Sequence, residues 1–369
     1  MEHSYWESAQ YQKHHHLIII GSGLVGLLTA LFYKKKHPFH SVLVLERGWL
    51  PEGASTRNAG FACFGSAGEI ADDLTKMPEE DVWETVKMRI DGLHLLREIV
   101  GDNYLKYRSC GGFELFNSTT LYEHVLTELE GLNKTFQSLT GLRSVYRPAK
   151  VHQGFNGLIG SVENQYEGDI DTGHLMRWLI RTTVALDVPI LTSTAVKHLQ
   201  EKANGIFIET DKGAFSAEKV VVATNGFASQ LLPLPEVLPA RAQVIVTNVL
   251  QKVPFSGTFH FDEGYYYFRE IEGRVLFGGG RNLDIKGETT FERGITEQIQ
   301  AQLELLLKEM ILPGIDFTIE QRWSGTMGVG RVKKPIIKQF SERLVGAVRM
   351  GGMGVAIGAK VAEKSVSLL

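Results

Sequence analysis

The stretch HLIIIGSGLVG, residues 16–26, decides the fold of this 369-residue chain. Its first part, His16–Ile20, is a short run rich in isoleucine, which is typical of a buried β-strand. Three glycines follow directly, Gly21, Gly23 and Gly26, in the spacing G-x-G-x-x-G. That spacing is common by itself, but it becomes informative where a strand leads into it and a helix leads out of it.

The residues after the turn supply that helix and a second strand. Leu24–Lys36 predicts a helix whose basic C-terminal end suits the helix dipole, and Ser41–Glu46 predicts another buried strand. Strand, turn, helix and strand form one βαβ unit. In such a unit Gly21 allows the tight turn, Gly23 lets the backbone approach a pyrophosphate, and Gly26 lets helix and strand pack closely. The unit therefore predicts a dinucleotide-binding domain.

Two further features of this unit describe the dinucleotide. The start of the helix, at Leu24 and Val25, offers free N–H groups and partial positive charge to a pyrophosphate. Glu46 ends the second strand, about 20 positions after Gly26. A carboxylate there accepts hydrogen bonds from ribose hydroxyls and repels a 2′-phosphate, which argues against NADP. NAD and FAD both remain open at this point.

Composition and charge exclude several other classes of protein. The formal net charge is −3, whereas nucleic-acid binding normally requires a basic surface. No apolar run is long enough for an integral membrane segment, and residues 1–13 do not resemble a secretory signal. The two cysteines, Cys63 and Cys110, are too few for a disulfide framework and favour a reducing, cytoplasmic location. No Cys/His spacing supports zinc, and the consecutive histidines His14–His16 point in different directions, so we expect no metal site.

The rest of the chain alternates between helical and strand patterns and then becomes β-rich. Leu238–Gly280 reads as short alternating segments, which are typical of an antiparallel sheet. Leu344–Val348 is the last buried strand, and Gly351–Gly354 opens a C-terminal helix. Residues 51–69 are rich in glycine and alanine and show no clear period. Helices are also predicted over Glu79–Val100, Thr119–Leu139, Asp171–Leu186 and Phe291–Met310, and strands over Tyr107–Phe116, Pro189–Leu191, Ala195–Gln200, Gly205–Glu209, Lys219–Ala223 and Phe317–Gly328.

Several segments, in the same order along the chain, resemble the superfamily of D-amino-acid oxidase and glycine oxidase. Residues 53–61, GASTRNAGF, are similar to its flavin-contacting segment. The likeness is greatest to the γ-glutamylputrescine oxidoreductase branch, in which this segment reads G-A-S-x-R-N-G-G. The other segments are VVVATNGF at 220–227, YYFR at 266–269 with RVLFGGG at 274–280, WSG at 323–325 and GGMG at 351–354.

The resemblance implies that the dinucleotide is FAD, held without a covalent link. Small residues at 58–60 let the backbone approach a flat ring system, and Arg57 and Asn58 can donate hydrogen bonds to it. The helix that opens at Gly351–Gly354 places its N-terminus near the pyrimidine end of the flavin, where reduced flavin gathers negative charge. The residues expected to contact FAD are Gly21, Gly23, Leu24, Val25, Gly26, Glu46, Arg47, Ser55, Arg57, Asn58, Ala59, Gly60, Val196, Ala223, Thr224, Gly226, Gly325, Gly351, Gly352, Met353, Gly354 and Val355.

The expected fold class is α/β, a Rossmann-type FAD-binding domain into which a β-rich substrate domain with a mixed sheet is inserted. The dinucleotide unit opens the chain and the glycine-opened helix closes it, so the FAD-binding domain is expected to be discontinuous. We assign residues 1–90, 145–235 and 325–369 to it, and residues 91–144 and 236–324 to the substrate domain.

The activity implied by the resemblance is hydride transfer from a carbon that bears an amine to flavin N5, which gives an imine that water hydrolyses. The expected substrate is a small amine or amino acid, and either oxygen or a quinone receives the electrons. Two alternatives stay open, an NAD-dependent dehydrogenase and a flavin-binding protein of this fold without amine turnover. Residues 55–61 and Gly351–Gly354 argue against the first, because NAD folds do not need them.

Substrate recognition is the least determined part of the sequence. An α-amino acid needs a cation for its carboxylate, ideally an arginine. Glycine oxidase and several relatives carry this arginine in an L-R-P element, but the corresponding stretch here, Trp323–Gly328, contains none. The absence speaks against a plain α-amino acid as the substrate. Arg269, Arg281 and Arg331 are the possible substitutes, and Arg269 is the one we favour.

We expect Arg269, Tyr267 and Tyr265 to form the catalytic site. The side chains of Tyr265–Tyr267 alternate in direction along a strand, so one or two of them face the substrate. On this hypothesis, replacing Arg269 with alanine lowers kcat/KM far more than it lowers FAD content. Met327 and Trp323 are candidates for an apolar wall, and Cys63, close to the flavin segment, is expected to be a buried free thiol.

Overall fold

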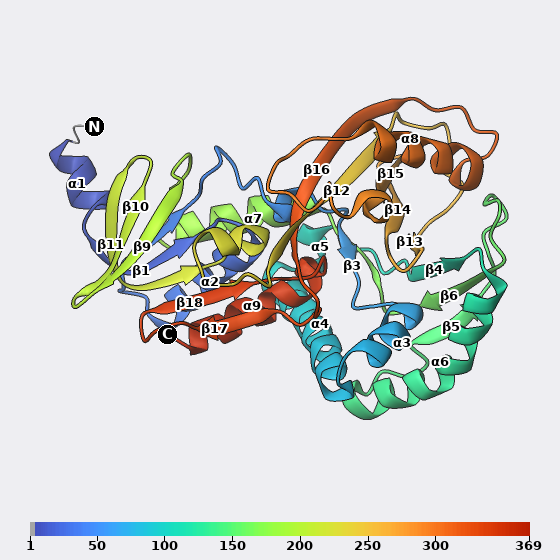
Figure 1. The fold of residues 1–369 in the computed structure, drawn as a ribbon, viewed down its shortest axis with the longest axis horizontal. Coiled ribbons are helices and arrows are strands. Elements are labelled where there is room, and N and C mark those ends of the chain that lie inside the picture. Colours follow the sequence, from blue (N-terminus) through green and yellow to red (C-terminus); the bar gives the residue numbers. More distant parts are fainter. Residues whose placement is uncertain (1–3) are drawn as a thin grey trace.

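The computed structural model describes residues 4–369, and its elements gather around two large sheets (Figure 1). The first sheet runs in the order β17-β18-β11-β1-β2-β8, and β10 and β9 continue from β11 as antiparallel neighbours. The strands from β18 to β8 along this path are parallel, and only β17 is antiparallel to its neighbour. The bounds are β1 (His14–Ile20), β2 (Val42–Leu45), β8 (Ile190–Leu191), β9 (Val196–Lys202), β10 (Gly205–Thr210), β11 (Gly213–Val222), β17 (Ile336–Gln339) and β18 (Leu344–Val348).

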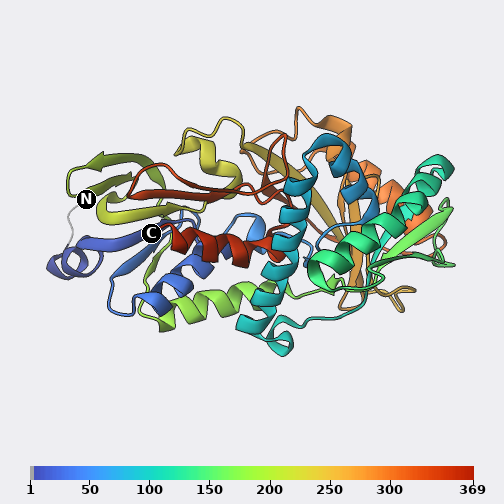
Figure 2. The ribbon, with the colours of Figure 1, turned by 90° about the horizontal axis from the view of Figure 1, so that it is seen from below.

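The predicted βαβ unit is confirmed, because α2 (Leu24–Lys36) connects β1 to the parallel strand β2. Successive residues of β1 point to opposite faces of the sheet, and both faces are covered. Leu17 and Ile19 pack against α2, α7 (Thr172–Ala185) and α9 (Gly354–Ser367), which lie side by side in Figure 2. Ile18 and Ile20 pack on the other face with residues of β10 and β11. Because both faces of β1 are buried, residues 17–20 form an uninterrupted apolar run.

The second sheet is mixed and runs in the order β16-β12-β15-β14-β13-β4-β6-β5. Its parallel pair is β13 with β4, and the other neighbours are antiparallel. Helix α8 (Glu297–Leu306) covers one face, and α3 (Ala67–Lys76) and α6 (Thr119–Thr140) lie at the other (Figure 1). The bounds are β4 (Gly112–Phe116), β5 (Tyr146–Ala149), β6 (Gly160–Asn164), β12 (Leu238–Thr247), β13 (Thr258–Phe261), β14 (Tyr266–Ile271), β15 (Arg274–Gly279) and β16 (Ile319–Val329).

Helix α4 (Glu79–Val100) lies between the two sheets and packs along α9. Its predicted bounds are confirmed, and Gly101 ends it with a positive φ of 87°. Short elements complete the chain: α1 (Tyr5–Tyr11), α5 (Asp102–Leu105) and the two-stranded ribbon of β3 (Phe61–Ala62) and β7 (Gly168–Asp169). The ribbon follows the segment that the sequence assigns to flavin binding, and it therefore connects that segment to the region between the sheets.

The α/β fold class with a mixed second sheet is confirmed, but sheet membership departs from the predicted domain boundaries. Strands β5 and β6 belong to the second sheet, although 145–235 was assigned to the FAD-binding domain. The boundary at residue 90 falls inside α4, which packs against α9 of the first layer. Residues 325–329 continue β16 in the second sheet. Strand pairing between distant segments sets these limits, and a local sequence pattern carries no record of it.

Some local predictions were also wrong. Residues 51–69 showed no period, yet α3 begins at Ala67. The signal was present, because Ser66 and Glu69 have the spacing of a capping box and the Ser66 hydroxyl accepts from the Glu69 amide at 3.1 Å. The helix expected over Phe291–Met310 starts only at Glu297, and it ends in a π-helical turn at Leu307–Ile311. The strand expected from Tyr107 starts at Gly112.

The contact between α4 and α9 depends on a glycine, and this can be tested. A Cβ on Gly92 would lie 2.3 Å from the carbonyl oxygen of Ala356, so Gly92→Ala must push the two helices apart. We expect the free energy of unfolding in urea to fall by about 1–3 kcal/mol. Gly131→Ala is the matched control, because nothing lies within 4 Å of that position on α6. It should stabilise by about 0.5–1 kcal/mol, and equal effects of both changes would contradict this account.

Candidate functional site

The glycine turn lies between β1 and α2, at the carboxyl end of the first sheet. Gly21 has a φ of 103°, a conformation that favours glycine, and a Cβ on Gly26 would lie 2.0 Å from the Gly21 carbonyl oxygen. The third glycine therefore allows helix and strand to pack, as the sequence predicts. Within residues 4–369, the amides of Gly23 and Val25 have no hydrogen-bond partner. Free amides at the start of a helix are the donors that an anionic pyrophosphate requires.

Glu46 lies beside this turn, where the sequence places the ribose partner. Its carboxylate accepts hydrogen bonds from the amide and the hydroxyl of Ser22 at 3.0 and 2.7 Å, and from the Gly48 amide at 2.9 Å. The side chain is buried and held rigidly. Two carboxylate oxygens offer about four acceptor positions, so one remains for a ribose hydroxyl. The role of Glu46 in binding ribose stays a prediction that this geometry allows.

The segment after β11 forms the opposite side of the turn. The Ala223 amide donates to the Ile20 carbonyl at 2.9 Å, and a Cβ on Gly21 would lie 2.9 Å from the Ala223 carbonyl oxygen. The Thr224 hydroxyl is buried and has no hydrogen-bond partner among residues 4–369. Gly226, in the 3-10 helix Asn225–Gln230, lies against the Met327 carbonyl. Two more predicted contacts flank the Glu46 end of the turn: Arg47, whose guanidinium lies 3.6 Å from the ring centroid of Phe227, and Val196, at the start of β9.

The flavin segment 53–60 connects α2 to the second sheet. The Leu24 amide donates to the Ser55 hydroxyl at 2.9 Å, which joins the segment to the start of α2. Arg57 joins it to β16 twice: its guanidinium donates to the Ser324 carbonyl at 2.9 Å, and its carbonyl accepts from the Trp323 indole at 3.1 Å. Gly325 lies beside the same arginine, since a Cβ there would be 3.1 Å from the Arg57 Cβ.

The side-chain amide of Asn58 uses both of its N–H groups within the protein, whereas Arg57 uses one of its five, so a hydrogen bond from Arg57 to the ring stays a prediction. The guanidinium of Arg57 is engaged by β16. The amide of Asn58 donates to the carbonyls of Ala54 and Ser55, and its oxygen accepts from the Gly60 amide and the Thr172 hydroxyl. Both side chains are thus used to hold the segment in shape. What the segment presents to a ligand is then mainly backbone, in line with the expectation that small residues at 58–60 let the backbone approach a flat ring system.

The start of α9 approaches the same region from the far end of the chain. Gly351 and Gly352 have φ values of 60° and 86°, and Gly354 begins the helix. The sulfur of Met353, just before the helix, lies 3.8 Å from the Cys63 sulfur, next to β3. Helices α2 and α9 therefore both begin close together, α2 at Ser55 of the flavin segment and α9 beside Cys63, which follows β3. Free amides, unpaired polar atoms and close glycine contacts at this place fit FAD better than a purely structural turn.

The comparison with known sequences decides the family. The family described as FAD-dependent oxidoreductase, DAO, matches residues 16–367. The chain belongs to this family. It is 22% identical over 365 residues to the probable oxidoreductase OrdL of Haemophilus influenzae, and the match covers 94% of this chain and 80% of that protein. FAD is thereby the cofactor, which excludes the NAD-dependent alternative, whereas nothing singles out the γ-glutamylputrescine branch.

Solved structures show the same fold. Glycine oxidase from Geobacillus kaustophilus superposes with a TM-score of 0.77 at 18% identity and covers 96% of this chain and 94% of its own. L-proline dehydrogenase from P. horikoshii also gives 0.77, at 16% identity, and covers 97% of this chain and 93% of its own. At such identities the likeness describes the fold of this DAO-family chain and not its substrate.

One row of side chains crosses the face of the second sheet that carries the flavin segment. Trp323, Val244, Gly278, Tyr267, His260 and Glu114 are neighbours in register on six successive strands. The half near β16 is apolar: Trp323 and Val244 pack with Ala59 and Phe61 of the flavin segment, and the Phe61 ring meets the Tyr267 ring edge-on at 5.9 Å. The half near β4 carries the imidazole of His260 and the carboxyl group of Glu114.

Of the predicted catalytic residues, Tyr267 alone faces the flavin segment through a free polar group. Its ring lies over Gly278, and among the described residues its hydroxyl has no hydrogen-bond partner. Burial raises the pKa of this hydroxyl to about 12. Tyr265 packs toward the core under α8, with the Arg281 guanidinium over its ring at 5.7 Å, so the sequence-based placement of Tyr265 in the site was wrong. Arg331 is exposed.

Arg269 is near the flavin segment, but its guanidinium is already paired. It lies 3.1 Å from the Asp169 carboxylate and donates to the Ile170 carbonyl at 3.1 Å. Its side chain is only 5% exposed. Asp169 is also bound by both ends of the Arg108 guanidinium, at 2.9 and 2.7 Å. We therefore correct the expectation that Arg269 binds a substrate carboxylate, since its charge is satisfied within the protein.

A group of buried ionisable side chains surrounds the His260 end of the row, and it was not predicted. Glu69 on α3 pairs with Arg89 on α4 at 3.2 Å and with Lys333 at 3.3 Å, and Lys333 also pairs with Asp73 at 2.9 Å. Although burial opposes it, the charges of Lys333 and Arg89 lower the pKa of Glu69 to about 2. Glu114, a glutamate inside the buried strand GFELF, is the sequence signal from which such a group could have been predicted.

Two other carboxyl groups in this region have raised pKa values, in contrast to the lowered pKa of Glu69. Burial raises the pKa of Glu114 to about 7, against the opposing hydrogen bond from the Gly68 amide at 2.8 Å. Burial also raises the pKa of Glu167 to about 8, although the amides of Phe64 and Gly65 donate to it. His260 is driven by burial to a pKa of about 4. At neutral pH the protein therefore holds a neutral imidazole here, with Glu167 largely protonated.

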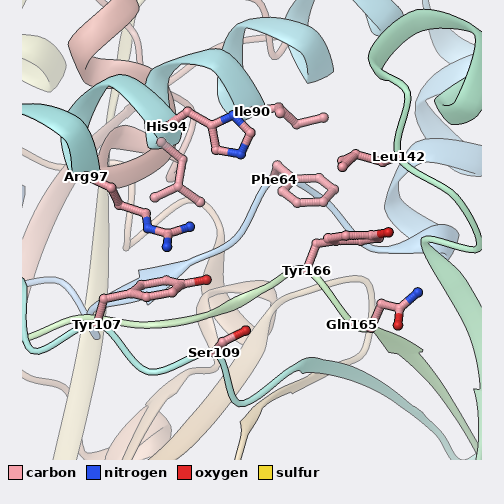
Figure 3. Close-up of a pocket in the computed structure, with 10 residues that line it drawn as sticks. Phe64, Ile90, His94, Arg97, Tyr107, Ser109, Leu142, Gln165 and Tyr166 are labelled. Atoms are coloured by element: carbon pink, nitrogen blue, oxygen red, sulfur yellow. The ribbon is translucent and has the colours of Figure 1, made fainter. Parts of the chain in front are cut away.

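A cavity of about 150 Å³ is lined by none of the predicted site residues. Phe64, His94, Arg97, Tyr107 and Tyr166 are among its lining side chains (Figure 3). Most of its polar groups are engaged. Arg97 binds Asp102 through two hydrogen bonds and stacks on Tyr107, and the Tyr166 hydroxyl donates to the Arg143 carbonyl. We do not assign this cavity a role in catalysis.

Two kinds of feature are absent from residues 4–369. No group of three histidine, cysteine, aspartate or glutamate side chains is arranged to hold a metal ion. No helix in that range is both long and apolar enough to cross a membrane.

Because Arg269 is paired with Asp169, we no longer expect its replacement to lower kcat/KM selectively. Arg269→Ala leaves part of the Asp169 charge uncompensated in the protein interior, so we expect the free energy of unfolding to fall by about 3 kcal/mol. FAD content and activity should fall together. Arg274→Ala, on the exposed pair with Glu320 in the next strand, is the control and should leave all three unchanged. A selective loss of kcat/KM with full FAD content would restore the original role of Arg269.

The raised pKa of Glu167 predicts a pH-dependent stability. Its pKa is about 8 in the folded protein and 4.5 as an unperturbed group, so the stability it contributes is complete below pH 4.5 and is lost as the pH rises to 8. Glu167→Gln imitates the protonated form and keeps an acceptor for the two amides. At about 1.4 kcal/mol per pKa unit, the variant should be a few kcal/mol more stable than the wild type at pH 9. It should match the wild type near pH 4.5, and parallel pH profiles of unfolding would refute the assignment.

Proposed function

We propose that this DAO-family protein oxidises the C–N bond of a small amine or amino acid to an imine, using bound FAD. The observation that carries the proposal is the meeting of three elements at one place. Segment 53–60 accepts hydrogen bonds from the Leu24 amide at the start of α2 and from the Trp323 indole of β16, and the start of α9 lies beside Cys63, next to β3. Ala59 and Phe61 pack on the aromatic half of the second sheet. A flavin held by α2, segment 53–60 and α9 would present its ring to the aromatic half of the second sheet.

Bound FAD supplies the hydride acceptor, and the chain has to position the donor carbon and exclude water. Phe61, Tyr267 and Trp323 form an apolar wall that suits both tasks, because a dry and rigid surface holds a small substrate in one orientation. The start of α9 contributes the partial positive charge of a helix N-terminus, which favours the negative charge that builds up on a reduced ring system.

The chain offers no catalytic triad on this wall, and the reaction does not require one. An amine that arrives neutral can lose hydride without prior loss of a proton to the protein. Tyr267 remains protonated at physiological pH, because its pKa of about 12 lies far above it, so its hydroxyl can donate to the substrate. The imine that results is hydrolysed by water after release.

Three further points belong to the proposal. FAD is held without a covalent link, since burial raises the pKa of the Cys63 thiol and so disfavours the reactive thiolate. Oxygen or a quinone receives the electrons. Two free cysteines, neither of them in a disulfide, agree with a reducing cytoplasmic location.

The proposal is tested by anaerobic mixing of purified protein with primary amines, secondary amines and amino acids. We expect the preparation to be yellow, to release FAD on denaturation, and to lose its flavin absorption when a substrate of this class is added. Secondary or primary amines without an α-carboxylate should bleach the flavin faster than α-amino acids, because the arginine nearest the site is paired. Full flavin content with no bleaching by any compound would favour the alternative of a flavin-binding protein without turnover.

A further inference from the structure

Two neighbouring side chains in the middle of the sheet row carry polar groups without a partner in residues 4–369. In the described part of the chain, neither the ring nitrogens of His260 nor the hydroxyl of Tyr267 has a hydrogen-bond partner. The two residues are opposite each other on β13 and β14, so their side chains leave the sheet on the same face. Both side chains are half-buried, and part of each is therefore open to a small molecule. Unpaired polar groups on a largely apolar wall indicate a ligand that pairs with them.

The state of His260 limits what it can recognise. Burial disfavours the imidazolium and lowers the pKa to about 4, so the ring is neutral and has one donor and one acceptor nitrogen. The charged group close enough to influence this pKa is Glu69 on α3. On the sheet, the neighbour of His260 on the side away from Tyr267 is Glu114. The imidazole is thus the neighbour of the Glu114 carboxyl, whose ionisation gives this part of the row a negative potential, and its free nitrogen can accept a hydrogen bond there.

The cations nearby do not reverse that potential. Arg89 is used by Glu69 and by the Phe64 carbonyl, and Lys333 is used by Glu69 and Asp73. These four charges sum to zero, and Glu114, with a pKa of about 7, adds negative charge above neutral pH. Arg269, on the same strand as Tyr267, forms an ion pair with Asp169. Among residues 4–369, a carboxylate at His260 would meet no free cation, whereas an ammonium or amide N–H would meet the imidazole acceptor and the Glu114 carboxyl.

We propose that His260 is a specificity-determining residue, whose neutral imidazole accepts a hydrogen bond from an amine or ammonium group of the substrate beyond the C–N bond that is oxidised. Glu114 supplies the negative charge that favours this second nitrogen, and the oxygen of the Tyr267 hydroxyl on the adjacent strand offers a further acceptor. The substrate class is therefore a molecule with two nitrogen groups joined by a short apolar chain. The inference rests on the proposed function for the identity of the oxidised bond.

The test compares three probes that differ only in the group at the far end. Pentylamine, 1,5-diaminopentane and 5-aminopentanoate are titrated anaerobically into the FAD-loaded protein, and binding is measured from the change in flavin absorption. We expect the diamine to bind about tenfold more tightly than pentylamine, because a hydrogen bond to a charged group contributes about 1.5 kcal/mol or more. The aminopentanoate should bind more weakly than pentylamine.

Variants assign the preference to His260. His260→Phe removes the acceptor and should abolish the advantage of the diamine while pentylamine affinity changes less than about twofold. His260→Gln keeps an acceptor and should retain part of the advantage. Glu114→Gln keeps the hydrogen bond from the Gly68 amide, and it should weaken the advantage most above pH 7, where the wild-type carboxyl is ionised. His198→Phe, at an exposed position on β9, is the control and should change nothing.

The outcomes separate this inference from the proposed function. Equal binding of the three probes, tighter binding of the aminopentanoate, or a diamine advantage that survives in His260→Phe would each overturn the role of His260. Selective binding of the diamine without bleaching of the flavin by any amine would instead count against the proposed oxidation and leave the role of His260 in recognition intact.

Discussion

The carboxylate of Asp169 is the interaction on which the arrangement of the site depends. It is buried and shared by Arg108 and Arg269, the first from the loop before β4 and the second from β14. The residue next to it, Ile170, donates its amide to the Gly60 carbonyl at 2.8 Å and accepts from Arg269. One buried anion therefore fixes the end of the flavin segment against the second sheet. Without two cations such a charge would be strongly destabilising in the interior, so sheet, ribbon and segment are held together as a unit.

The same logic explains why the polar side chains of the flavin segment are turned inward. Arg57 and Asn58 satisfy carbonyl groups of β16 and of the segment itself, which would otherwise be left unpaired near a dry site. The segment is then rigid before any ligand binds, and its backbone is what remains to contact the cofactor. A rigid frame reduces the entropy that binding has to overcome, and it fixes the flavin segment against the apolar wall formed by Phe61, Tyr267 and Trp323.

The parts of this structure that follow from local chemistry could be read from the sequence, and those that depend on pairing could not. The bounds of α2 and α4 were predicted because their apolar pattern, glycine turn and terminal residues are all local. The family was visible in short segments around the cofactor. The fate of Arg269 was not, because whether a guanidinium binds substrate or Asp169 depends on a partner 100 positions away in the chain. For the same reason the sequence did not show that β5 and β6, inside the range 145–235 assigned to the FAD-binding domain, pair into the second sheet.

The buried acids around His260 show how such distant pairings can also indicate function. Glu114 and Glu167 both have raised pKa values, so at neutral pH and above they cost stability that glutamine at the same places would not. Glu167 has a structural use, because it accepts from the amides that lead out of β3. Glu114 has one such bond, from Gly68, and lies beside an imidazole that has none. A destabilising carboxyl next to an unsatisfied imidazole, on the wall that faces the flavin segment, is most simply explained by a ligand that supplies the missing donor.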